Sequence, residues 1–112
     1  MADDRLPTHI WVMAHVRRCM DANIPAIVVH KGEASSGTLL LKINLLAGEC
    51  RLFSQARDLD GNLGWMGAFD GNLVPEAEAD TYITRAVSRD PDLWVVEIED
   101  RKGVNPFDGN LI

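Results

Sequence analysis

His15 and Cys19 stand four residues apart in a stretch with helical periodicity, so both side chains fall on one side of a helix. Two such donors can ligate one metal ion, and Cys50 and His30 could complete a four-ligand zinc site. Two features oppose this. The sequence has no tight pair such as C-x-x-C, and Cys19 lies on the apolar side of its helix, where a thiol packs as a small hydrophobic group. We therefore predict no metal site and no cofactor.

The same residue types could also support acid–base or nucleophilic catalysis. Neither cysteine, however, lies at a helix N-terminus or beside a basic cluster that would activate its thiol. Glu97 and Glu99 alternate with apolar residues, as carboxylates do on the solvated face of a strand. We predict no catalytic residue and favour a non-enzymatic protein, while an enzymatic role stays open.

The tetrapeptide DGNL occurs three times, at 60–63, 70–73 and 108–111. Counted from Asp58, the first copy places oxygen donors where an EF-hand calcium loop has them. Leu63 then occupies the glycine position and Phe69 the position of the bidentate glutamate, so the match fails. Asp-Gly and Gly-Asn tolerate the positive φ of tight turns. We predict that DGNL forms turns and is neither a calcium site nor a structural repeat.

The composition is that of an acidic globular domain: 112 residues, 46% hydrophobic, 25% charged and a net charge of -6. The scattered Lys and Arg residues predict no nucleic-acid partner and no binding to an anionic membrane. No apolar run approaches the ~20 residues of a membrane-spanning helix. The start, MADDRLPTH, lacks the basic and apolar segments of a secretory signal, which predicts a cytoplasmic protein with reduced thiols.

Periodicity predicts the order helix, four strands, helix, strand. The helices are expected at 8–23 and 74–90, and the strands at 26–31, 38–46, 50–57, 64–69 and 93–100. Short connections indicate an antiparallel sheet of about five strands, and two amphipathic helices can cover one of its faces. The predicted fold is a two-layer α+β sandwich in a single domain, 1–104, with a C-terminal tail, 105–112.

This arrangement leaves large apolar side chains without cover on the helix surface and on the outer sheet face. Exposed apolar patches usually mark contacts with partners. We therefore predict a small accessory or interaction protein that forms a homodimer or binds a protein partner. The interface residues are expected to be Trp11, Arg18, Phe53 and Val95.

The alternative is a small-molecule-binding domain or minor enzyme. Its pocket would lie between the first helix and the sheet, with His15, Arg18 and His30 as polar lining.

Three stretches together resemble a known family: IWVMAHVRRC, IPAIVVHKGEASSGTLLLKIN and VPEAEADTYITRAVSRDPDLWVVEIEDRKG. The sequence is similar there to short alphaproteobacterial proteins that have only a domain-of-unknown-function label. The resemblance spans roughly residues 5–104, while 58–72 and the tail beyond Gly103 fit it less closely. It implies a small cytosolic bacterial protein and assigns a role to no individual residue.

Overall fold

The computed structural model describes residues 6–112 of the chain. Residues 1–5, part of the start from which a cytoplasmic location is predicted, lie outside the described range. Within 6–112, no helix is both long and apolar enough to cross a lipid bilayer.

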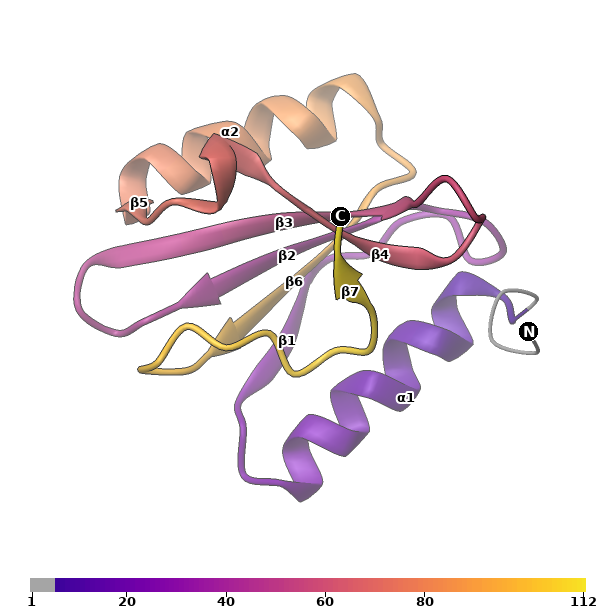
Figure 1. Ribbon diagram of the computed structural model, residues 1–112, viewed down its shortest axis with the longest axis horizontal. Coiled ribbons are helices and arrows are strands. Elements are labelled where there is room, and N and C mark those ends of the chain that lie inside the picture. Colours follow the sequence, from indigo (N-terminus) through magenta and orange to yellow (C-terminus); the bar gives the residue numbers. More distant parts are fainter. Residues whose placement is uncertain (1–5) are drawn as a thin grey trace.

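Residues 6–112 form two α-helices and a seven-stranded sheet (Figure 1). The helices are α1 (Thr8–Asp21) and α2 (Glu76–Arg89), and a short 3-10 segment is η2 (Ala68–Gly71). The strands are β1 (Ala26–His30), β2 (Leu39–Asn44), β3 (Glu49–Arg57), β4 (Leu63–Gly67), β5 (Val74–Pro75), β6 (Trp94–Glu99) and β7 (Asn110–Leu111).

The sheet is mixed and not wholly antiparallel as predicted. Its order is β1-β6-β2-β3-β4-β7, and β5 pairs with β3. β2 runs parallel to β6, and β4 runs parallel to β7, while the other pairs are antiparallel. The predicted meander fails because β6 lies between β1 and β2. This strand is apolar on both sides, with a buried Val95 next to a buried Val96, and a central position lets both faces be covered.

The two helices lie on opposite faces of the sheet, which corrects the prediction that both cover one face (Figure 1). Trp11, Val12 and Cys19 of α1 pack on one face, in a cluster that includes Leu41. On the other face, α2 forms two smaller clusters, one with Cys50 and Leu52 and one with Leu40 and Val95. The reason is visible in β2, where all six residues are buried, because such a strand needs cover on both sides. The architecture is α+β with three layers.

Because both faces of the sheet are covered, large apolar side chains that the sequence analysis expects to be exposed are buried. Trp11 and Phe53 are each 7% exposed, and Val95 is fully buried. All three of these predicted interface residues are therefore buried within the fold. The large apolar side chains that remain exposed are different ones, and any contact surface has to be argued from them.

The glycine of each DGNL copy has a positive φ, but only the first copy follows a turn; the second lies at the end of η2, and the third leads into β7. Gly61, Gly71 and Gly109 have φ values of 83°, 76° and 124°. In the first copy, the Asp58 carboxylate accepts hydrogen bonds from the backbone N–H groups of Asp60 and Asn62, at 2.9 Å each. This carboxylate thus closes a turn with its own backbone.

The tail returns to the body of the protein. Phe107 is 4% exposed within the α1-side core, and β7 forms part of the sheet beside β4. The indole Nε1 of Trp65 donates a hydrogen bond to the backbone oxygen of Asp108 at 3.0 Å. Residues 105–112 are therefore packed against the fold.

Replacing Trp11 with alanine tests whether this ring is core. Trp11→Ala is expected to lower the free energy of unfolding by about 3–5 kcal/mol, since a large buried ring is lost. Ile10→Ala on the same helix is a matched control, because Ile10 is 46% exposed, and is expected to change stability by less than about 0.5 kcal/mol. Urea unfolding measures both, and equal effects would contradict this packing.

Candidate functional site

A buried lysine lies at the centre of the α2 side of the sheet. Lys42 of β2 has a side chain only 5% exposed, and its Nζ donates hydrogen bonds to Glu76 at 2.8 Å and Asp80 at 2.7 Å. Glu97 of β6 lies 3.5 Å away. The charge is thus held by two carboxylates of α2 and one of the sheet. These contacts connect the first turns of α2 to the two central strands.

The chemistry of this cluster is that of a structural ion pair. Burial opposes the charged form of Lys42, but the hydrogen bonds to Asp80 and Glu76 outweigh it and raise the pKa of the ammonium above its usual value. Lys42 therefore stays charged and does not act as a nucleophile at neutral pH. Burial also raises the pKa of the nearby Cys50 thiol to about 11, so this thiol stays protonated.

Asn44 extends the cluster by one further side chain. Its Nδ2 donates hydrogen bonds to Glu97 at 3.0 Å and to Glu76 at 3.3 Å, and its Oδ1 accepts from the backbone N–H of Leu46. Neither Lys42 nor Asn44 is among the site residues predicted from the sequence. The signal available was a single cation inside the apolar run LLLKIN, followed by an acidic helix start at Glu76.

The sheet edge beside this cluster is uncovered. Among residues 6–112, β1 pairs only with β6, so one side of its backbone has no partner strand in that range. Its side chains alternate: Ala26 and Val28 pack toward the α1-side core, while Ile27 and Val29 are 65% and 55% exposed. Val29 also borders a groove of about 440 Å³ with Lys42 at its polar side. β1 is therefore an uncharged edge strand with apolar side chains in solvent.

A second apolar hollow adjoins the start of β1. Met20, at the end of α1, is 57% exposed and shares this hollow of about 390 Å³ with Ile24, Pro25 and Ile27. Met13 lies two helical turns before Met20 and is 49% exposed. Exposed apolar side chains thus lie on both sides of the unpaired edge.

The polar residues predicted to line a pocket hold the tail. His15 of α1 is 8% exposed, and its Nδ1 donates a hydrogen bond to the backbone oxygen of Trp11 at 2.8 Å. Its Nε2 lies 3.2 Å from the Asp108 carboxylate but outside hydrogen-bond geometry. Arg18 donates to Asp108 at 3.0 Å and to the backbone oxygen of Pro106 at 2.7 Å. We call the three residues His15, Arg18 and Asp108 the tail clamp.

His30 lies apart from the tail clamp, at the end of β1. Its Nδ1 donates a hydrogen bond to the backbone oxygen of Leu93 at 2.7 Å. The structure therefore brings His15 and Arg18 together through Asp108, while His30 joins the edge strand to the segment before β6. Within residues 6–112, no group of three or more His, Cys, Asp or Glu side chains could hold a metal ion.

A hollow between α1 and the sheet is present, with a different lining from the one predicted. It measures about 330 Å³ and is bordered by Thr8, Trp11, Gln55 and Arg57 together with residues 35–38. In the loop beside this hollow, the Glu33 carboxylate accepts hydrogen bonds from the backbone N–H groups of Ser35 and Ser36. These bonds lower the pKa of Glu33.

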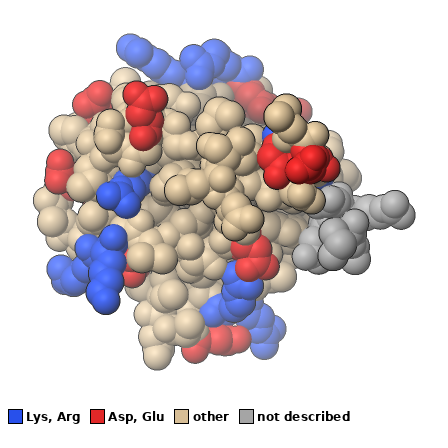
Figure 2. Space-filling model, viewed as in Figure 1, with Lys and Arg blue, Asp and Glu red and all other residues tan. Residues whose placement is uncertain are grey.

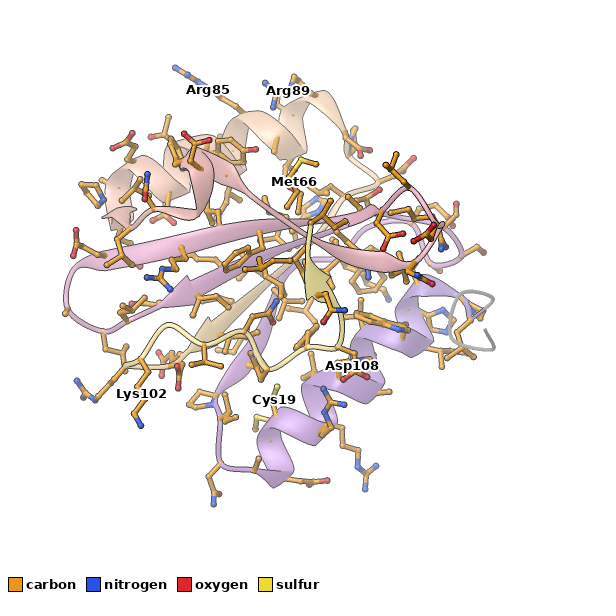
Figure 3. All side chains as sticks on the ribbon, in the orientation of Figure 1. Cys19, Met66, Arg85, Arg89, Lys102 and Asp108 are labelled. Carbon is orange, nitrogen blue, oxygen red and sulfur yellow. The ribbon has the colours of Figure 1, made fainter. Side chains whose placement is uncertain are left out.

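Removing the buried charge tests the Lys42 cluster. Lys42→Met keeps the length of the side chain but leaves three carboxylates without their cation. Because Glu76 and Asp80 are 44% and 56% exposed, solvent screens part of the loss, and a decrease of about 1–2 kcal/mol in the free energy of unfolding is expected. Lys102→Met is the control, since Lys102 is exposed and extends into solvent (Figure 3). Chemical denaturation measures both variants. Equal stability of Lys42→Met and the parent protein would exclude a structural role for the cluster.

The tail clamp predicts a pH dependence. Burial alone would raise the pKa of Asp108, but its hydrogen bond with Arg18 and its contact with His15 prevail and lower it. A lowered pKa means a contribution to stability that is complete above about pH 4 and lost as pH falls through the folded-state pKa. Urea unfolding measures the difference in stability between the parent protein and Asp108→Asn. This difference should be constant above about pH 4 and should shrink as the pH falls further. A difference that grows on acidification would contradict it.

Comparison with solved structures shows close relatives. A crystal structure of a DUF1491 family protein from Caulobacter crescentus CB15 has 40% identity and a TM-score of 0.84, covering 96% of this chain and 99% of that one. An NMR structure of a DUF1491 family protein from the same organism gives 39% identity and a TM-score of 0.79, with 96% and 97% covered. The solution structure of protein Atu0922 from A. tumefaciens has 28% identity and a TM-score of 0.71, and the match covers 86% of each chain.

No curated protein matches the chain significantly. The family model described as "Protein of unknown function (DUF1491)" matches residues 6–108. This match and the Caulobacter structures confirm the resemblance noted in the sequence and name no activity. The chain belongs to the DUF1491 family.

Proposed function

We propose that this protein is a small non-enzymatic interaction protein that self-associates by pairing its β1 edge with the β1 edge of a second copy. The single observation that supports this is the uncharged edge strand β1, which has Ile27 and Val29 in solvent and lacks a partner strand on one side within residues 6–112. An edge of this kind is a template for pairing with another strand. Natural monomers usually place charged residues on such edges, and AIVVH contains no Lys, Arg, Asp or Glu.

The geometry of the edge suits a twofold arrangement. Two β1 strands in antiparallel register keep the same face of each sheet together. Ile27 and Val29 of one copy then meet the same two residues of the other, and four exposed apolar side chains leave water. A bulge shifts the register with β6 between Val28 and His30. The straight part available for pairing is therefore Ala26–Val28, with Val29 flanking it.

The apolar hollow at Met20 enlarges the contact beyond the strand itself. It lies next to the edge and contains no charged residue. Burial of apolar surface contributes about 25 cal/mol per Å², so these flanking side chains add to the main-chain hydrogen bonds. The net charge of -6 opposes close approach of two copies, and salt is expected to strengthen the dimer by screening this repulsion.

A cytoplasmic location is part of this proposal. Both cysteines are free and buried, which suits a compartment that keeps thiols reduced.

A charge placed on the edge tests the proposal. Light scattering of the parent protein should give the mass of a dimer, and Ile27→Lys should give a monomer, because a buried unpaired ammonium is strongly unfavourable. Leu59→Lys is the matched control, since Leu59 is 106% exposed in a loop away from the edge, and should leave the dimer intact. A folded parent that stays monomeric at concentrations of about 1 mM, or a dimer that survives Ile27→Lys, would refute the proposal.

A further inference from the structure

Arg51 has one guanidinium nitrogen, the Nε, that finds no hydrogen-bond partner within residues 6–112. It lies on β3 between the buried Cys50 and Leu52, so its side chain points to the opposite face of the sheet. Its Nε atom is buried and has no hydrogen-bond partner among residues 6–112. No ion pair involves Arg51 in that range either.

An unsatisfied donor of this kind is costly. A buried polar group without a partner costs about 1–3 kcal/mol, and a charged one costs more. Native proteins retain few such groups, and each calls for a physical reason. Because the Nε is buried, a ligand would pair with the part of the Arg51 side chain that lines open space.

The surroundings of Arg51 define what that ligand would touch. The side chain lines an open hollow of about 450 Å³ between β3, β4, η2 and β7. Phe53 is buried beside it, while Met66, Leu111 and Ile112 border it at 52%, 73% and 49% exposure. The hollow thus combines one cation with apolar walls. The face over β4 and β7 bears few charged side chains (Figure 2).

The rim of the hollow is held in an unusual backbone conformation. Phe69 and Asp70 both have left-handed geometry, with φ values of 54° and 57°. Two successive non-glycine residues in this region cost roughly 1–2 kcal/mol each, and such strain tends to concentrate at binding sites. Asp70 lies on the rim, where its carboxylate repels a doubly charged anion more strongly than a singly charged one.

We propose that this hollow binds a small aliphatic monocarboxylate. The carboxylate accepts hydrogen bonds from the Arg51 guanidinium, whose planar fork matches two oxygens. The alkyl chain lies along Phe53, Met66 and Leu111, where burial of apolar surface adds affinity. Asp70 favours this single charge over the double charge of a phosphate. The site lies on β3, β4 and β7, away from the β1 edge of the proposed dimer.

Octanoate is the probe, and 1-octanol is its neutral counterpart of equal chain length. Isothermal titration calorimetry at neutral pH is expected to give octanoate a Kd at least about tenfold lower than that of octanol, since a charge-assisted hydrogen bond contributes more than a neutral one. In Arg51→Gln, octanoate should bind no better than octanol. Arg51→Lys should retain part of the preference.

Arg89→Gln is the matched control, because Arg89 lies at the end of α2 and points away from the sheet (Figure 3). It should bind octanoate as the parent does. Thermal unfolding provides the check on folding: Arg51→Gln removes an unsatisfied group and should not lower the melting temperature. No measurable binding, equal affinity for octanoate and octanol, or unchanged octanoate affinity in Arg51→Gln would each overturn the proposal.

Discussion

Burial of β2 on both faces is the constraint from which the other features follow. A central strand with six buried residues requires a helix layer above and below the sheet. α1 covers one side with a single aromatic-rich cluster, and α2 covers the other with two smaller ones. Lys42 and Asn44 are the polar exceptions on this strand, and both are satisfied by side chains of α2 or β6. Their charge and hydrogen bonds fix how α2 lies on the sheet.

Two helices cannot cover every strand of a sheet this wide. β1, at one edge, has cover on the α1 side alone, so Ile27 and Val29 stay in solvent. At the opposite edge, β7 consists of two exposed residues next to the hollow that contains Arg51. The two proposals of a self-associating edge and a carboxylate site therefore concern the two places that the helix layers leave open.

The sequence predicts the elements of this fold better than their arrangement. Both helices and the five longer strands follow from periodicity, and the positive φ at the glycine of each DGNL copy follows from the chemistry of Asp-Gly. The layer arrangement is not predicted, because the sequence analysis expects the outer sheet face to be open, whereas Leu40 and Val95 on that face pack against α2. Continuous apolar runs such as LLLKIN and LWVVEI are typical of strands buried on both sides. The alternating pattern of a one-sided sheet is absent there.

The candidate sites depend on contacts between distant parts of the chain, which no local pattern reveals. His15 and Arg18 look like pocket residues in the sequence, yet Asp108 of the tail engages both. Lys42 finds its carboxylates at Glu76, Asp80 and Glu97, which lie more than thirty residues further along. Arg51 stands out only because its Nε has no hydrogen-bond partner in the described part of the folded chain. These relations are set by packing, which the identity of single residues does not encode.

The parallel pairing of β2 with β6 has a consequence for synthesis of the chain. In the described part of the chain β1 pairs with β6 alone, and β2 pairs with β6 on one side. During synthesis of α2, the sheet that α1 covers is therefore still incomplete. β1 and β2 can pair with β6 only after residues 94–99 have been synthesised. Association of contacts this far apart along the chain slows folding and leaves apolar segments open in the meantime. AIVVH is then at its most accessible to chaperones and to other nascent copies.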